Sequence, residues 1–246
     1  MYKDKKVNAI IQARMGSSRL PGKVLLDLGD KKVLDHVIDR LDNSKLIDNI
    51  IVATSDKEQD DKIEEWAKTR GIDYYRGSEE NVLKRFYDTA NKYPSDIISR
   101  ITADCPLISY KLVDDVIKKL IDQDLDYVSM DNDLIPRGLH GSAFTFDVLE
   151  DVYEKANKDY QKEHVTYYIY EDNGDEYKVG YLEPPEWLIR DYRLTLDTKK
   201  DYELLKNIFA KFKNEEYLKI ESIIKLLDNE PNLQRINKNI KQKSVK

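Results

Sequence analysis

Short apolar runs alternate with amphipathic helical patterns through the first half of this chain. The runs NAIIQA, IDNIIVAT, IDYYRG, DIISRIT and DYVSMD have the length and composition of strands. The segments between them, such as VLDHVIDRL and SYKLVDDVIKKLIDQ, repeat apolar residues at the spacing of one helical face. This alternation predicts an α/β fold in which a mostly parallel sheet carries helices on both faces.

The pattern changes from about residue 132 onward. GSAFTFDVLEDVYEKA predicts a strand followed by a helix, YKVGYLEPP and YRLTLDT predict strands, and KDYELLKNIFAKF predicts a closing helix. Because no repeat or flexible linker divides the chain, we expect residues 1–246 to form a single domain with an inserted sub-region at about 132–190. The basic end, residues 230–246, is expected to be frayed.

Composition narrows the class of protein. The net charge of −6 argues against nucleic-acid binding, which usually needs a basic face. The single cysteine, Cys105, excludes an internal disulfide framework and fits a reducing compartment. The first residues lack the features of a signal peptide, and no window approaches the roughly 18 apolar residues of a membrane span. We therefore expect a cytoplasmic protein without a membrane span.

The segment QARMGSSRLPGK, residues 12–23, follows the first predicted strand and carries Arg14, Arg19 and Lys23 between two glycines and a proline. Ligands of parallel sheets bind beyond the carboxyl ends of the strands. Main-chain N–H groups and fixed positive charge in such a loop are the usual means of holding phosphate. Three cations within ten residues of an acidic chain therefore predict a phosphate-binding loop.

This loop matches neither of the two common phosphate-binding motifs. Gly16 and Gly22 are one residue too far apart for a P-loop, and Val24 follows Lys23 where a metal-binding hydroxyl belongs. A dinucleotide fingerprint needs a third glycine and an earlier helix start. The loop is therefore of another kind.

Two aspartates follow predicted strands. Asp104, in RITADCP, is placed to hold a divalent cation that bridges phosphates, although an Asp before a turn can equally cap main-chain amides. Asp197, in RLTLDT, could complete an octahedral Mg²⁺ site with Asp104 and a triphosphate, or could cap the helix that begins near Lys200. Cys105 has no base beside it in the sequence, so we interpret it as a packed residue rather than a nucleophile.

The stretch RGSEENVLKRF places Arg76, Ser78 and Arg85 around a helix start. Ser78 and Asn81 could cap that helix, while Arg76 could contact a base edge or a phosphate. No metal-binding spacing links the three histidines, so we predict no zinc site.

Taken in order, these motifs resemble the family of spore-coat polysaccharide and acylneuraminate cytidylyltransferases. The matching segments are IIQARMGSSRLPGKVL, IIVATSD, YYRGSEENVLKRF, RITADCPLIS, PRG, EHVTYYIY and RLTLDT, over roughly residues 7–210. Broader relatives are the synthetases of CMP-sialic acid and CMP-3-deoxy-manno-octulosonate. The resemblance implies a Rossmann-like nucleotidyltransferase sheet and transfer of CMP from CTP to an oxygen of an acidic sugar or related anionic acceptor. Pyrophosphate would be released, with Mg²⁺ as cofactor, in surface-polysaccharide precursor synthesis.

The resemblance also implies roles for individual residues. Those assigned to the nucleotide are Gln12, Ala13, Arg14, Gly16, Ser18, Arg19, Lys23, Arg76 and Ser78. Of these, Gln12 and Ala13 would lie against the base and ribose, and Arg76 would contact the cytosine with its neighbour Ser78. Asp104 and Asp197 would bind Mg²⁺. The residues with a catalytic role would be Arg19, Lys23 and Asp104, because the charge that builds on the leaving group needs stabilisation.

The acceptor would meet Arg137, His140 and Ser142. The family usually has an acidic pair after its Arg-Gly, and His140 and Ser142 stand in those places here. Ala103 replaces a glycine before Asp104. We hypothesise that His140, neutral or cationic, suits a more anionic acceptor such as a phosphate or phosphonate. Relatives often form homodimers through the inserted sub-region, where the tyrosine-rich YQKEHVTYYIY could lie in the interface or in the core.

Three other functions remain open from the sequence. One is a nucleotidyltransferase that prefers another base, because a triphosphate loop does not contact the base. A nucleotide-sugar-dependent glycosyltransferase shares the α/β sheet and a metal-binding Asp, but it binds a diphosphate and rarely needs so many cations after the first strand. The third is a non-catalytic nucleotide-binding protein.

Overall fold

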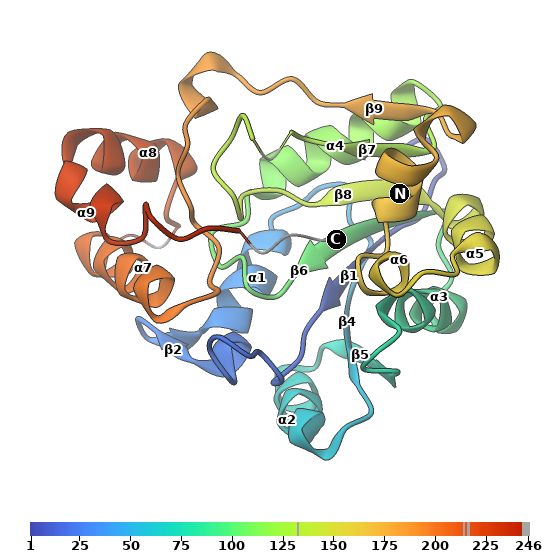
Figure 1. The fold of residues 1–246 in the computed structure, drawn as a ribbon, viewed down its shortest axis with the longest axis horizontal. Helices are drawn as coiled ribbons and strands as arrows, with labels where there is room; N and C mark the ends of the chain where they lie inside the picture. The colour runs from blue at the N-terminus through green and yellow to red at the C-terminus, as the bar shows by residue number, and fades with distance from the viewer. Residues whose placement is uncertain (132, 214, 216, 243–246) are drawn as a thin grey trace.

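The computed structural model describes residues 1–131, 133–213, 215 and 217–242 (Figure 1). The described residues form a central sheet of seven strands in the order β5-β4-β1-β6-β8-β7-β9. The strands are β1 (Val7–Gln12), β4 (Asn49–Ser55), β5 (Asp73–Gly77), β6 (Ile97–Thr102), β7 (Tyr127–Ser129), β8 (Ser142–Thr145) and β9 (Val179–Tyr181). Only β8 runs against its neighbours β6 and β7 among the pairings of this sheet. The predicted mostly parallel α/β sheet is confirmed.

Helices cover both faces of the sheet. On one face lie α1 (Val33–Leu41), α2 (Asp61–Arg70) and α4 (Tyr110–Asp122), and on the other lie α3 (Val82–Lys92) and α5 (Phe146–Lys155). Alternate residues of the strands point to opposite faces, so two separate apolar clusters form, one on each side. The helix ends follow local signals, because the side chains of Asn81 and Ser109 cap α3 and α4, and α2 ends at Gly71 with φ of 66°.

The remaining elements are short or lie at the edges of the sheet. A small hairpin joins β2 (Asp27–Leu28) to β3 (Lys31–Lys32). The tyrosine-rich stretch forms α6 (Asp159–Glu163) and a π-helical turn, η3 (Tyr168–Asp172). The 3-10 turns are η1 (Lys23–Leu25), η2 (Glu58–Asp60), η4 (Gly174–Glu176) and η5 (Glu186–Leu188). Within the described ranges, no helix has the length and apolar character that crossing a membrane requires.

The C-terminal third packs beside the sheet rather than apart from it. Figure 1 shows α7 (Lys199–Lys211), α8 (Ile220–Asn229) and α9 (Pro231–Arg235) grouped together, in orange and red. Their apolar residues belong to the same buried cluster as α1 and α4. The predicted frayed end is wrong for residues 231–237, because Leu233 packs into this cluster and the Asn237 side chain is buried. The last four residues, 243–246, lie outside the described residues.

The segment YRLTLDT is extended but is not a strand of the sheet, so that prediction is wrong. Its ladder contact is a single bridge between Arg137 and Arg193, with Arg137 N donating to Tyr192 O at 3.0 Å and Leu194 N to Arg137 O at 2.9 Å. Leu196 N also donates to Asp104 O at 2.8 Å. These bonds place Asp197 directly beside the loop that follows β6.

Gly138 lets this extended segment approach so closely. Its φ is 98°, and a Cβ there would lie 2.8 Å from Thr195 N. Both the backbone conformation and the contact exclude other residues without strain.

We predict that Gly138→Ala lowers the free energy of unfolding by about 2 kcal/mol or more, because strain and a backbone clash add. Gly29→Ala is the matched control, since Gly29 has φ of 67° but nothing lies within 4 Å of the added Cβ. That control should cost only about 1 kcal/mol. Urea unfolding of both variants checks this, and equal losses would contradict the close-packing argument.

Candidate active site

The cation-rich loop leaves the carboxyl end of β1 and folds back on itself. Gly22 N and Ser17 N both donate to Met15 O, at 2.9 and 2.8 Å. Met15 N donates to the fully buried carboxylate of Asp60 at 2.6 Å. Asp60 therefore anchors the turn, a role that its place in the sequence did not reveal.

Lys23 connects the two predicted metal-binding aspartates. Its Nζ lies 2.5 Å from Asp104 Oδ2 and 2.8 Å from Asp197 Oδ1. Burial alone would lower the pKa of Lys23, but the two carboxylates raise it above its usual value, so the ammonium stays charged. Oxygens of two carboxylates thus converge on one cation, although Asp104 and Asp197 lie 81 and 174 residues from Lys23 in the sequence.

Two further cations, Arg19 and Arg193, form salt bridges with Asp197. Arg19 Nη2 lies 3.1 Å and Arg193 Nη2 2.5 Å from Asp197 Oδ2. Burial disfavours the carboxylate form, but Lys23, Arg19 and Arg193 together hold the pKa of Asp197 below its usual value. The side chain that caps α7 is Thr198, so the alternative role of Asp197 as a helix cap is wrong.

A buried network supports this arrangement from behind. The fully buried Asp201 accepts hydrogen bonds from Arg193 Nε at 3.1 Å, Thr198 N at 2.8 Å and Asn237 Nδ2 at 2.8 Å. Asn237 also donates to Arg193 O at 2.9 Å. Asn237, near the end of the chain, therefore fixes the position of Arg193, and Arg193 in turn positions Asp197 through their salt bridge.

Besides its three cations, the loop or its start carries four other residues that were assigned to the nucleotide. Gln12 ends β1, and its Oε1 is buried without a hydrogen-bond partner. Ala13 is buried, whereas Ser18 is exposed. A Cβ on Gly16 would lie 2.9 Å from the Glu79 carboxylate, so the loop passes close to the turn before α3.

Two arginines, Arg14 on this loop and Arg85 on α3, lie near enough for their charges to repel each other. Arg14 is exposed and lies 3.9 Å from Glu163 of α6. Arg85, on α3, is buried and donates from Nη1 to Ser78 O at 2.6 Å, while its Nε has no partner. Burial and the nearby charge of Arg14 lower the pKa of Arg85 to about 10. This repulsion favours an anion between or beside them.

Arg76 is directed elsewhere. All three of its guanidinium nitrogens are engaged, by Ser55 O, Lys57 O and the carboxylate of Glu64 on α2. Ser78 Oγ accepts from Asn81 N at 3.0 Å, which stabilises the turn before α3. The structure therefore joins Arg76 to α2 and not to the Lys23 site.

The three residues assigned to the acceptor differ in their surroundings. Arg137 forms a salt bridge of 3.0 Å with exposed Asp133. His140 Nδ1 lies 2.9 Å from Gly141 O, and burial lowers the pKa of His140 below 6.5. The imidazole is therefore neutral near pH 7, so the cationic form of our hypothesis is not supported. Ser142 is buried on β8, with Oγ unpaired.

Asp104 and Asp197 are the residues that could hold a divalent cation. Within residues 1–131, 133–213, 215 and 217–242, no group of three or more His, Cys, Asp or Glu side chains is arranged to bind a metal. Mg²⁺ is commonly held by one or two carboxylates together with substrate phosphates, so a two-carboxylate site suits it.

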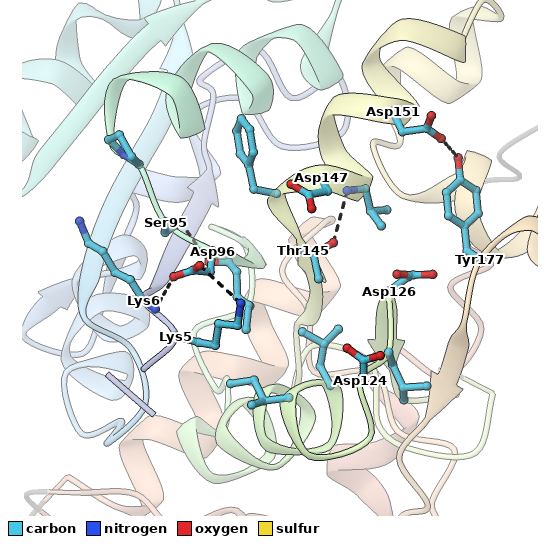
Figure 2. A pocket seen from close by; sticks show the side chains of 17 residues that line it. Lys5, Lys6, Ser95, Asp96, Asp124, Asp126, Thr145, Asp147, Asp151 and Tyr177 are labelled. Atoms are coloured by element: carbon cyan, nitrogen blue, oxygen red, sulfur yellow. Dashed lines mark hydrogen bonds and ion pairs between the residues drawn. The ribbon is translucent and has the colours of Figure 1, made fainter. Parts of the chain in front are cut away.

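A cavity of about 780 Å³ lies at the opposite end of the sheet, where β1 and β6 begin. Figure 2 shows its side chains, with Lys5 and Lys6 beside Asp96 and with Asp151 directed at Tyr177. Tyr177 donates to Asp151 at 2.6 Å, and Asp96 accepts from Lys6 N at 2.8 Å. The cavity is thus separate from the cation-rich loop at the carboxyl ends of these strands.

We predict that Cys105 reacts slowly in the folded protein. It is 6% exposed, and burial raises the pKa of its thiol to about 12. Labelling by iodoacetamide at about pH 8 should be on the order of 100-fold slower than in urea, because the thiolate is the nucleophile. Mass spectrometry checks this, and rapid labelling of folded protein would contradict the packed role.

We also predict that Asn237→Ala lowers the free energy of unfolding by about 1–3 kcal/mol, because Asp201 loses a buried donor. Asn239→Ala is the control, since Asn239 is exposed on the same segment, and it should change stability by less than about 0.5 kcal/mol. Urea unfolding separates the two. Equal stabilities would mean that the end of the chain does not support the site.

The sequence is similar to those of known proteins over almost its full length. A model of the cytidylyltransferase family matches residues 8–240. The chain is 46% identical over 242 residues to an uncharacterized protein of Methanocaldococcus jannaschii, covering 98% of each. It is 40% identical over 228 residues to the spore coat polysaccharide biosynthesis protein SpsF of Bacillus subtilis, covering 90% of this chain and 94% of SpsF.

The fold is similar as well. A solved cytidylyltransferase from Leptospira borgpetersenii superposes with a TM-score of 0.85 at 34% identity, covering 98% of this chain and 100% of that chain. The resemblance read from the motifs is thereby confirmed. The chain belongs to the cytidylyltransferase family of nucleotidyltransferases.

Proposed function

We propose that this protein transfers CMP from CTP to an oxygen of an acidic sugar or related anionic acceptor and releases pyrophosphate. The observation that carries the proposal is the convergence of Lys23 and Arg19 with Asp104 and Asp197 at the carboxyl edge of the sheet. Cations from the loop after β1 would hold the triphosphate. Carboxylates from two other segments, Asp104 and Asp197, lie within 3 Å of one of these cations, Lys23 Nζ.

The reaction needs no protein nucleophile. An acceptor oxygen attacks the α-phosphorus in line, the bond to the bridging oxygen of the β-phosphate breaks, and pyrophosphate leaves with the electron pair. A hydroxyl acceptor also loses its proton to solvent or to a nearby base. Arg19 and Lys23 would stabilise the negative charge that grows on the leaving group.

Mg²⁺ fits the two carboxylates, because their oxygens already converge on one positive group, the Lys23 ammonium. Bound to Asp104 and Asp197, it would neutralise charge on the phosphates. Lys23 would then be free to donate to phosphate oxygens instead of to the carboxylates.

Several finer points belong to the same proposal. Arg14, and Arg85 whose charge it repels, would contact the nucleotide, and Arg76 would do so only after leaving its ion pair with Glu64. A role in surface-polysaccharide precursor synthesis agrees with the similarity to SpsF. A homodimer would bury apolar side chains that are exposed at the end of β9 and in the chain after it, namely Tyr181, Trp187 and Ile189.

We predict selective binding of CTP over UTP, GTP and ATP in the presence of Mg²⁺. Asp104→Asn should weaken CTP binding about tenfold or more, because one carboxylate charge next to Lys23 and the cation is lost. Asp147→Asn is the control, since Asp147 lines the distant cavity. Isothermal titration calorimetry measures both.

Other outcomes distinguish the alternatives. Selective binding of a different nucleotide would replace CTP, and preference for nucleoside-diphosphate sugars would indicate a glycosyltransferase. Tight CTP binding without pyrophosphate release for any acceptor would indicate a non-catalytic binding protein. Absence of nucleotide binding would contradict the proposal.

A further inference from the structure

Arg100 lies on β6, the strand that leads into the loop of Asp104. Its backbone pairs with Ile10 of β1 and with Ser142 of β8, so the three side chains point to the same face of the sheet. Ile10 belongs to the apolar cluster under α3 and α5, which identifies that face. Gln12, two residues beyond Ile10, shares it and lies at the carboxyl edge.

Three polar side-chain atoms along this edge lack hydrogen-bond partners among the described residues. Arg100 Nε, Gln12 Oε1 and Ser142 Oγ are all buried without a hydrogen-bond partner. In the part of the chain that the structure describes, no carboxylate lies within 4 Å of the Arg100 guanidinium to form a salt bridge. Burial also lowers the pKa of Arg100, against the opposing effect of Tyr127, Tyr170 and Asp104.

Two other arginines, Arg40 and Arg193, have internal partners for their guanidinium groups. Arg40 donates to the carbonyls of Ile108 and Leu218, and Arg193 donates to Asp197 and Asp201. An uncompensated guanidinium away from water is costly, so its retention indicates a ligand that supplies the negative charge.

Arg100 is also at a suitable distance from the reacting atoms. Asp104 lies four positions further along the chain, a backbone span of at most about 13 Å at about 3.3 Å per extended residue. The long Arg100 side chain and an acceptor molecule together can cover such a distance. The stacked rings of Tyr127 and Tyr170, with centroids 5.5 Å apart, interact with the Arg100 charge and would flank the acceptor.

We infer that Arg100 binds the anionic group of the acceptor, an oxyanion of the carboxylate or phosphonate class, with the Ser142 hydroxyl beside it. This inference rests on the proposed function. The planar guanidinium fork matches two oxygens of such a group. Arg100 thereby supplies the positive charge that the sequence suggested for His140, which is neutral, and that Arg137 already shares with Asp133.

The test compares wild type with Arg100→Gln and Arg100→Lys. N-acetylneuraminate, 3-deoxy-manno-octulosonate and phosphonoacetate are titrated into protein saturated with CTP, together with the neutral methyl ester of N-acetylneuraminate. Arg70→Gln is the matched control, because it removes the same charge from the surface end of α2.

We expect wild type to bind at least one of the three anions and not the neutral ester. Arg100→Gln should weaken that binding about 10- to 100-fold, the scale of a charge-assisted hydrogen-bond pair, and should change the Kd of CTP less than about twofold. Arg100→Lys keeps the charge but loses the planar fork, so its affinity for the anion should lie between those of wild type and Arg100→Gln. If Arg100→Gln does not fold, the comparison of Arg100→Lys with wild type serves as the test. Which of the anions binds will distinguish a carboxylate acceptor from a phosphonate acceptor.

Three results would overturn the inference while leaving the proposed function in place. They are unchanged anion binding in Arg100→Gln, absence of anion binding to wild type that binds CTP, and an equal loss of CTP binding in Arg100→Gln, which would assign Arg100 to the nucleotide. Failure of wild type to bind CTP would instead overturn the proposed function, and this inference with it.

Discussion

The bridging of Asp104 and Asp197 by the Lys23 ammonium is the interaction on which the site depends. Two carboxylates so close together repel each other unless a cation lies between them. This bridge joins the loop after β1, the loop after β6 and the extended segment before α7, which are far apart in the sequence. Electrostatic attraction therefore holds these three segments together at the carboxyl edge of the sheet. Another cation that replaces Lys23 between the two carboxylates would keep the segments together in the same way.

The rest of the polar core is arranged to keep Asp197 in place. Asp197 lies on a segment that is not part of the sheet, so ladder hydrogen bonds cannot orient it. Arg193, Asp201 and Asn237 do so instead, through a buried network that is fully paired. This explains why residues 231–237 pack against the protein, although their composition resembles that of a frayed terminus. The buried Asp201 carboxylate is less stable without the donor from Asn237.

The sequence predicted the sheet and most helices because burial repeats with a period of two or 3.6 residues, and each strand keeps that period locally. Lys23 and Asp104 were singled out for a second reason, since both lie in loops that follow strands of a parallel sheet. Arg193, Asp201 and Asn237 were missed because their partners are distant and no short motif records the pairing. The ion pair of Arg76 with Glu64 was missed for the same reason, since the sequence does not show that Glu64 on the preceding helix lies beside the end of β5.

The distinction between paired and unpaired polar groups then separates structural from ligand-binding residues in this protein. The chain has a net charge of −6, so anionic substrates are repelled at long range and depend on local cations at the carboxyl edge of the sheet. Arg19 and Lys23 are already neutralised by aspartates, and binding a triphosphate there exchanges one set of anionic partners for another. Among the described residues, Arg100 has no aspartate or glutamate partner to give up. An anion that reaches Arg100 therefore gains its full charge-assisted hydrogen bonds without breaking an existing ion pair, which makes this position well suited to selecting an acidic acceptor over a neutral one.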